Sequence, residues 1–258
     1  MRIRIRTAYA CALALLSLPG LALAPAKASE FVCRPTSLIT TATTPDFTAL
    51  WRKGDGPLRL LAIGSSSTEG VGASAKDRTY PARLAALLRQ GLSGRAVEIV
   101  NAGIGGEIAP QTLQRLKKAL AETRYDLVIW QVGTNDAVTG GDLQAFRALI
   151  ADGIAAARQS QTRLAILDPQ FYPGIKETAR YRAYVDAIAE IARANGVPVL
   201  SRFAAMSGWY QRDAEGFMAA LAGDRFHMSD AGYSCLAQDI ARSLLERAPG
   251  VTLASTAH

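Results

Sequence analysis

The sequence contains few cysteines, few histidines and, after residue 23, no long run of apolar residues. Three cysteines among 258 residues exclude a disulfide-rich scaffold and a multi-cysteine zinc site. Two histidines, His227 and His258, are too few for a histidine-based metal cluster, so no metal site is expected. Hydrophobic residues make up 49% of the chain and charged residues 20%, which excludes disordered, collagen-like and coiled-coil proteins. A chain of this length forms one α/β domain, or at most two small ones, around a substantial core.

The amino-terminal 28 residues have the pattern of an export signal. Three arginines within the first six residues precede an apolar stretch from Ala8 to Leu23, and Ala26-Lys27-Ala28 fits the small-x-small cleavage pattern. We therefore predict a signal peptide over residues 1–28 and a periplasmic or secreted mature protein. An uncleaved membrane anchor is the alternative, because the apolar stretch is about as long as a short spanning helix.

The net charge argues against a nucleic-acid partner. The whole chain carries a formal charge of +7, and loss of the four positive charges in the predicted signal lowers it to +3. Binding to a phosphate backbone needs clustered Lys and Arg, which this balance does not supply. The sequence after the predicted signal contains no segment long and apolar enough to span a bilayer, so no stable membrane span is expected after cleavage.

Export changes how the cysteines are interpreted. Cys11 is removed with the predicted signal, and Cys33 and Cys235 remain near the two ends of the mature chain. In an oxidising compartment these two can form a disulfide that ties an N-terminal arm to the C-terminal helix. Two separate buried thiols are the alternative.

The chain divides into an irregular arm and a regular domain. Residues 29–56 are rich in Thr and show no clear period, so we predict an arm packed on the surface of a domain spanning residues 57–258. Within that domain, short continuous apolar runs alternate with segments of helical periodicity, which predicts a three-layer α/β/α fold with a five-stranded parallel sheet. The predicted strands are Leu58–Ile63, Val97–Val100, Leu127–Val132, Leu164–Leu167 and Val197–Leu200.

One internal stretch, residues 202–223, is less regular than the rest. It contains Trp209, Tyr210, Phe217 and Met218, which suggests part of a pocket wall. Trp209 and Tyr210, together with Tyr172, are candidates for a sugar subsite, and packing in the core or at its rim is the alternative for these aromatic residues.

Polar motifs follow three of the predicted strands, and a fourth precedes the last helix. Functional groups in open parallel sheets gather at the carboxyl ends of the strands, so these motifs mark a candidate site. His227 is the credible imidazole base, because His258 is the last residue of the sequence. The four motifs are Gly64–Gly70, Asn101–Gly106, Gly133–Asp136 and Asp224–His227.

The residue types in these motifs are those of nucleophilic acyl transfer. An aspartate three residues before His227 can hold the imidazole tautomer, and serines at a strand-to-helix turn supply a nucleophile. The glycine-rich motif at residues 103–106 forms either a tight turn or a close backbone approach to a ligand. It matches neither the dinucleotide fingerprint nor the phosphate-binding loop. Asn135 either caps a turn or donates to a developing oxyanion.

Taken together, the four motifs resemble those of the SGNH (GDSL-type) hydrolase family from Leu58 to Arg247. The family's first block, Gly-Asp-Ser-x-Thr-x-Gly, reads Gly-Ser-Ser-Ser-Thr-Glu-Gly over residues 64–70, so Ser66 aligns with the nucleophile. Ser65 stands where the family has aspartate, a residue outside its catalytic triad. The resemblance implies a flavodoxin-like fold, a triad of Ser66, Asp224 and His227, and an oxyanion hole of Ser66, Gly106 and Asn135.

The resemblance also implies ester hydrolysis without a metal or other cofactor. We expect an exported serine hydrolase acting on a small-molecule or polysaccharide ester, in particular a short-chain or carbohydrate O-acetyl ester. The small and polar residues 137–141 favour a short acyl group. Alternatives are a thioesterase or lysophospholipase for longer acyl chains, transfer to an alcohol acceptor, and a non-catalytic carbohydrate or lipid binder. The sequence does not indicate the oligomeric state.

Overall fold

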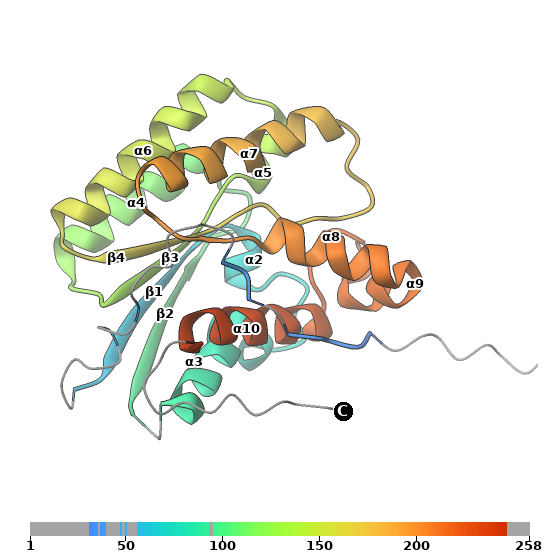
Figure 1. The fold of residues 1–258 in the computed structure, drawn as a ribbon, viewed down its shortest axis with the longest axis horizontal. Helices are drawn as coiled ribbons and strands as arrows, with labels where there is room; N and C mark the ends of the chain where they lie inside the picture. Colours follow the sequence, from blue (N-terminus) through green and yellow to red (C-terminus); the bar gives the residue numbers. More distant parts are fainter. Residues whose placement is uncertain are drawn as a thin grey trace, which may run out of the picture.

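Five parallel strands form one sheet in the order β2-β1-β3-β4-β5 in the computed structural model, which describes residues 31–35, 37–39, 47, 50, 56–92 and 95–246 (Figure 1). Helices cover both faces, so the predicted three-layer α/β/α fold is confirmed. The order changes direction between β1 and β3, which is where ligands bind in sheets of this kind. The strands are β1 Leu58–Gly64, β2 Val97–Gly103, β3 Leu127–Gln131, β4 Arg163–Leu167 and β5 Val199–Leu200.

The central strands β1 and β3 are mostly apolar because both of their faces are buried. In β1, Leu60 and Ala62 lie in the hydrophobic core on one face of the sheet, and Leu61 and Ile63 lie in the core on the other. None of these four side chains is more than 1% exposed. Successive side chains of a strand point to opposite faces, so a strand in the middle of three layers needs apolar residues at every position.

Two sets of helices cover the sheet. On one face, α4 packs against α6 and α6 against α7, and on the other α3 packs against α10 (Figure 1). Pro110 lies in the first turn of α4, where a missing N–H is tolerated. The Asp142 side chain accepts hydrogen bonds from two backbone N–H groups at the start of α6. The helices are α3 Tyr80–Gly91, α4 Ala109–Glu122, α6 Leu143–Gln159, α7 Thr178–Ala194 and α10 Asp230–Leu245.

The stretch 202–223, expected to be irregular, is mostly helical. It forms α8 (Arg202–Arg212), α9 (Ala214–Phe217) and a short 3₁₀ turn. The sequence obscured these helices because a buried arginine and two glycines interrupt their apolar period. Trp209 and Phe217 are buried and belong to the core of the α3–α10 face.

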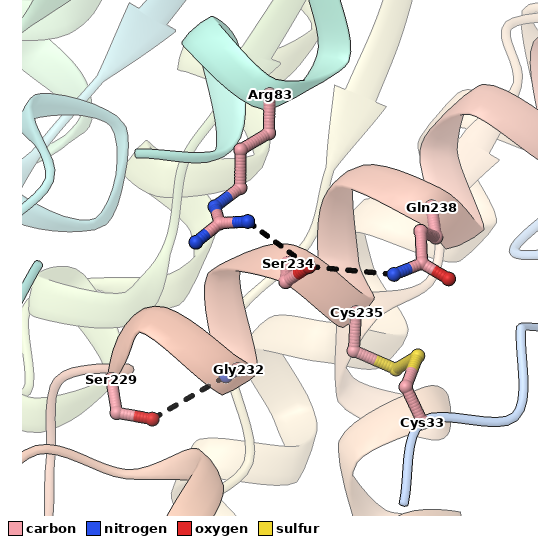
Figure 2. The surroundings of a disulfide bond; sticks show 7 residues. All are labelled: Cys33, Arg83, Ser229, Gly232, Ser234, Cys235 and Gln238. Carbon is pink, nitrogen blue, oxygen red and sulfur yellow. Dashed lines mark hydrogen bonds between the residues drawn. A yellow bond between two sulfur atoms is a disulfide. The ribbon is translucent and has the colours of Figure 1, made fainter. Parts of the chain in front are cut away.

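The described parts of the N-terminal arm run between α10 and the edge of the sheet. Cys33 and Cys235 of α10 form a disulfide with a Cα–Cα distance of 5.4 Å (Figure 2). Further along, Ile39 forms an antiparallel bridge with Leu200 of β5, and Leu38 N donates to Ser243 Oγ at 2.7 Å. The predicted signal peptide lies outside the described residues. Among the helices of the described residues, none has the length and hydropathy of a membrane span.

Candidate active site

The first motif forms a sharp turn between β1 and the short helix α2 (Ser66–Glu69). Its serines are buried, and the side chain of Gln131, at the end of β3, holds the turn: Gln131 Oε1 accepts from Ser65 N at 2.8 Å and from Ser65 Oγ and Thr68 Oγ1 at 3.2 Å. Through these two hydrogen bonds to Gln131, Ser65 helps to hold the turn. The turn leaves Ser66 at the carboxyl end of β1, in the first turn of α2.

Three side chains from distant parts of the chain form one hydrogen-bonded series. His227 Nε2 lies 2.9 Å from Ser66 Oγ, and His227 Nδ1 lies 2.5 Å from Asp224 Oδ2. Asp224 Oδ1 accepts from the backbone N–H of His227 at 2.9 Å and of Phe226 at 3.0 Å. The carboxylate therefore fixes both the backbone and the ring of His227. With Nδ1–H donating to Asp224, Nε2 is free to accept the serine proton.

The environment of Asp224 keeps its carboxyl group ionised. Partial burial acts to raise the pKa of Asp224, but the hydrogen bonds from the His227 ring and from two backbone N–H groups outweigh it and hold the pKa below its usual range. A carboxylate that accepts several hydrogen bonds is stabilised in its charged form. Asp224 is thus negatively charged where a protonated His227 would need a counter-charge.

The glycine-rich loop after β2 lies against the turn that carries Ser66. A Cβ at Gly103 would lie 1.9 Å from Glu69 N, so a side chain at this position would collide with the backbone of α2. A Cβ at Gly105 would lie 3.9 Å from Ser66 Cβ. The sequence left open whether these glycines form a tight turn or a close approach, and the structure shows a close approach to the serine turn. Gly106 follows at the exposed end of the loop with φ +80°.

Asn135 lies beside the same loop, at the start of the short helix α5 (Thr134–Thr139). Its side-chain Nδ2 donates to the backbone oxygen of Glu107 at 2.8 Å. An amide NH₂ carries two protons, so one N–H remains for a ligand. The structure therefore places Asn135 next to the residue that follows Gly106, and these two predicted oxyanion donors lie on adjoining segments.

Gln170 connects the serine turn to the histidine loop, a role that sequence analysis missed. Its side chain is fully buried: Oε1 accepts from Ser67 Oγ at 2.9 Å, and Nε2 donates to the Phe226 carbonyl oxygen at 2.8 Å. Phe226 precedes His227, so the amide spans the two segments that carry Ser66 and His227. Gln170 follows the end of β4 closely, a position that marks functional groups in this fold.

A fully buried guanidinium lies beneath the site. Arg202 donates to the Asp168 backbone oxygen at 3.1 Å and to Thr134 Oγ1 at 3.3 Å. The Asp168 carboxylate, also buried, accepts from Ser201 Oγ and Phe203 N. Burial raises the pKa of Asp168 to about 6, although these hydrogen bonds and the charge of Arg202 act to lower it. Burial also lowers the pKa of Arg202.

We expect Arg202→Met to destabilise the fold by about 3–5 kcal/mol, and by more at pH 8 than at pH 5. The unfolded pKa of an aspartate is about 3.9, so the raised folded value makes stability fall as pH rises through about 4 to 6. Removing Arg202 raises the Asp168 pKa further and leaves an unpaired buried carboxylate at pH 8, whereas at pH 5 the carboxyl takes up a proton. Urea unfolding at the two pH values measures the difference.

Arg147→Met is the matched control, because Arg147 forms an ion pair with Glu190 at 2.9 Å in which the carboxylate is half-exposed. We expect a loss of less than about 1 kcal/mol for this variant. An equal loss for Arg202→Met at both pH values would contradict the electrostatic effect of Arg202 on the Asp168 carboxyl group.

The aromatic candidates for a sugar subsite separate in the structure. Tyr172 is half-buried, and its ring packs edge-on against Phe226 with centroids 4.8 Å apart, one residue from His227. Trp209 is 3% exposed and packs against Phe31. Trp209 also borders a cavity of about 200 Å³ between α8 and the arm, lined by Ser37, Leu38, Ser201, Ala204, Ala205, Gly208, Trp209 and Arg212. None of the triad candidates lines this cavity. In the part of the chain that the structure describes, no three His, Cys, Asp or Glu side chains gather as metal ligands.

This fold, with a serine, a histidine and an aspartate joined at the carboxyl edge of the sheet, is that of the esterase- and lipase-like hydrolases. A model of the non-GDSL lipase-like family matches residues 33–249. The chain belongs to this family, and with it to the SGNH/GDSL-type hydrolases, as the motifs predicted. No curated protein sequence matches the chain.

Solved structures of hydrolases share the fold. The lipase/acylhydrolase from Enterococcus faecalis has a TM-score of 0.60 at 22% identity, covering 74% of this chain and 96% of that one. Axe2, an acetylxylan esterase from Geobacillus stearothermophilus, has a TM-score of 0.60 at 22% identity, covering 73% and 95%. TesA has a TM-score of 0.59 at 22% identity, covering 72% and 99%. At these identities the likeness concerns the fold.

Proposed function

We propose that this protein is an exported serine esterase in which Ser66, His227 and Asp224 form the catalytic triad. The observation that carries the proposal is the hydrogen-bonded series from Asp224 through His227 to Ser66, with distances of 2.5 and 2.9 Å. A serine, an imidazole and a carboxylate in this order form the arrangement of nucleophilic acyl transfer on several unrelated folds.

In the proposed reaction, Ser66 Oγ attacks the ester carbonyl carbon while His227 Nε2 takes the hydroxyl proton. The tetrahedral intermediate then breaks its bond to the alkoxy oxygen, which leaves as an alcohol with the proton from His227. Water then attacks the acyl carbon while His227 takes its proton. The bond from that carbon to Ser66 Oγ breaks, the carboxylic acid leaves, and His227 returns the proton to Ser66 Oγ. Asp224 orients the imidazole and stabilises its charged form.

The oxyanion would be held by the backbone N–H groups of Ser66 and Gly106 and by Asn135 Nδ2. Ser66 N–H lies in the first turn of α2, where a helix leaves N–H groups without an internal acceptor. Gly106 is exposed, in the loop that lies against the serine turn, and its N–H would donate to a bound ester. Three donors on adjoining segments would stabilise the tetrahedral intermediate. Loss of one such donor typically lowers the rate by about 10²–10³.

For the substrate, we propose a short-chain ester such as an O-acetyl group on a carbohydrate. The shared fold with an acetylxylan esterase supports this choice, as do the small residues between Asn135 and α6. Tyr172, packed against Phe226 beside the triad, offers an aromatic face to a sugar ring. The Cys33–Cys235 disulfide supports an oxidising location, and hence a periplasmic or secreted protein.

Longer acyl chains are the second candidate, and exposed apolar side chains favour them. Three apolar side chains near the site are exposed: Val71 to 37%, Ile104 to 47% and Val138 to 42%. Each lies within five residues of a predicted site residue, in the segments of Ser66, Gly106 and Asn135. Three exposed hydrophobic residues on the segments that carry the site offer contacts to an acyl chain.

A series of 4-nitrophenyl esters distinguishes the two candidates. We expect kcat/KM for the acetate to exceed that for the octanoate by at least about tenfold, because each added methylene that a short acyl pocket does not accommodate costs about 1 kcal/mol or more. Release of acetate from acetylated xylan, with deacetylated xylan as the control, tests the carbohydrate. A preference for the octanoate or longer esters would favour a lysophospholipase or thioesterase instead.

A further inference from the structure

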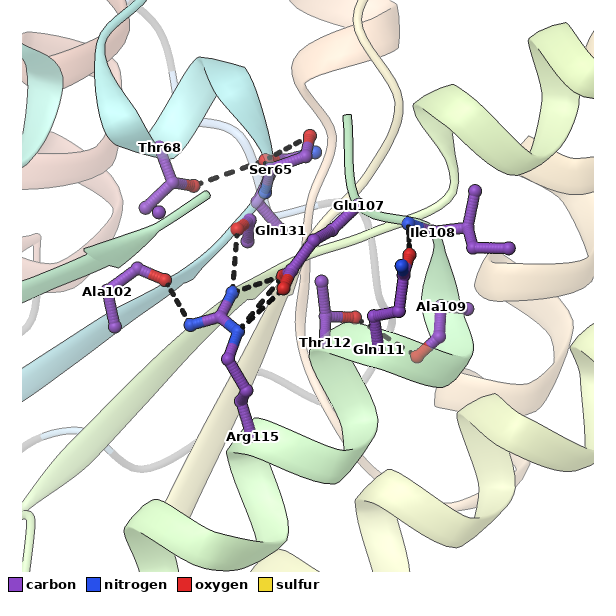
Figure 3. Close-up of polar contacts among 12 residues, drawn as sticks. Ser65, Thr68, Ala102, Glu107, Ile108, Ala109, Gln111, Thr112, Arg115 and Gln131 are labelled. Carbon is purple, nitrogen blue, oxygen red and sulfur yellow. Dashed lines mark hydrogen bonds and ion pairs between the residues drawn. The ribbon is translucent and has the colours of Figure 1, made fainter. Parts of the chain in front are cut away.

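Arg115 of α4 connects the ends of β1 and β2 with the loop that carries Gly106. Its Nη1 donates to the Ala102 backbone oxygen at 2.7 Å, and its Nη2 donates to the Gly64 backbone oxygen at 3.1 Å. Its Nε lies 3.0 Å from each carboxylate oxygen of Glu107, and its Nη2 also donates to Glu107 Oε2. Figure 3 shows the guanidinium between the Ala102 carbonyl and the Glu107 carboxylate.

Each contact of Arg115 lies next to a group of the proposed site. Gly64 is the last residue of β1, two positions before Ser66, and Ala102 lies at the end of β2, where the glycine loop begins. Glu107 directly follows Gly106. One guanidinium therefore joins the backbone beneath the nucleophile to both ends of the oxyanion loop.

Glu107 extends the same connection to the third oxyanion donor. Its carboxylate receives Arg115, and its backbone oxygen accepts Asn135 Nδ2 at 2.8 Å. The side chains of Arg115 and Glu107 are 26% and 12% exposed, so water screens this ion pair less than a surface pair. The orientation of the Asn135 amide thus depends on where Arg115 holds Glu107.

We propose that the Arg115–Glu107 pair positions the oxyanion hole, a role that rests on the proposed esterase function. Residues 104–106 are exposed and include two glycines, and glycine has the largest conformational freedom of all residues. Donors stabilise an oxyanion only when they are held in place before the reaction. Arg115 and Glu107 touch no substrate atoms in this role, and they act through Gly106 and Asn135 as positioning residues.

Arg115→Met tests the proposal, because methionine keeps much of the side-chain volume but cannot hold either backbone oxygen or the carboxylate. We expect kcat for 4-nitrophenyl acetate to fall about 10²-fold, the cost of displacing a catalytic group by about 1 Å. KM should change less than threefold, because the oxyanion develops only in the transition state. The acid limb of the pH–rate profile should not move, because His227 and Asp224 keep their contacts.

Lys117→Met is the matched control on the same helix, since Lys117 forms an ion pair with Asp152 at 2.6 Å on the exposed side. We expect wild-type kinetics for it. Glu107→Gln is the second variant: its amide still accepts one hydrogen bond from Arg115, so its loss in kcat should be smaller, about tenfold. In the Arg115→Met background, Glu107→Gln should add little, because the two residues act as a unit.

The outcomes of these experiments separate the inference from the function. If wild-type enzyme hydrolyses the ester and folded Arg115→Met has an unchanged kcat, the positioning role is wrong and the esterase function stands. A shift of the acid limb, or a rise in KM that accounts for the loss, would also contradict the role. If Arg115→Met does not fold, an unchanged kcat in Glu107→Gln overturns the inference. Failure of the proposed function would appear in wild-type enzyme as hydrolysis that does not depend on Ser66.

Discussion

Ser66→Ala should lower kcat/KM for 4-nitrophenyl acetate by about 10⁴- to 10⁶-fold, the largest effect of any single change. Without Oγ no acyl-enzyme forms, and water must attack the bound ester directly. The fold should remain, because the Ser66 hydroxyl contacts His227 and takes no part in the hydrogen bonds that hold the turn. Steady-state kinetics measure the loss in kcat/KM, and a thermal melting curve shows whether the fold remains.

Ser160→Ala is the matched control for this variant. Ser160 follows α6 and precedes β4, so it lies toward the amino end of the sheet, opposite the candidate site. Its hydroxyl donates to the Ala157 backbone oxygen, a bond that has no part in the reaction. We expect full activity from it. Activity above about a tenth of wild type in Ser66→Ala would rule Ser66 out as the nucleophile.

Asp224→Asn should lower kcat by about 10⁴-fold, the second largest effect. Asparagine can keep the acceptor oxygen that receives the backbone N–H of His227, so the loop should retain its shape. The amide NH₂ then faces His227 Nδ1 and donates to it, which moves the ring proton to Nε2. In that tautomer the imidazole donates toward Ser66 and is unable to take its proton. Steady-state kinetics with 4-nitrophenyl acetate measure the loss.

Asp230→Asn provides the control. The Asp230 carboxylate also lies near the site segments, and it accepts hydrogen bonds from the backbone N–H and the hydroxyl of Ser74. It has no contact with His227, and its replacement should change kcat less than threefold. A loss below about tenfold in Asp224→Asn would show that the imidazole does not depend on Asp224 for its tautomer.

The sequence predicted the sheet well because a strand covered on both faces must be apolar throughout. The apolar run Leu127–Val132 predicts a buried strand, and β3 covers Leu127–Gln131. The prediction for the stretch 202–223 was wrong because α8 buries Arg202. This charge lies near the buried Asp168, which follows β4. A charge compensated by a residue 34 positions away leaves no local sequence signal.

The candidate site was predicted from polar motifs at strand ends, but its supports were not. The backbone order of a parallel sheet brings together the three motifs that follow strands. His227 lies in the motif before the last helix, and its convergence on Ser66 was expected from the resemblance to the family. Gln131, Gln170 and Arg115 act through side-chain hydrogen bonds, most of them to residues far away in the chain, which leave no local pattern in the sequence. Gln131 has one visible signal, since it is a lone amide in a strand of apolar residues.

The most direct test of the central claim is to trap the nucleophile with a fluorophosphonate and locate the adduct by peptide mass spectrometry. The reagent forms a bond from serine Oγ to phosphorus as fluoride leaves, and it needs the same activated hydroxyl as an ester does. The triad predicts one adduct, on Ser66, that is lost in Ser66→Ala and formed far more slowly in Asp224→Asn. An adduct on Ser65 or Ser67 in wild-type protein, or none at all, would contradict it.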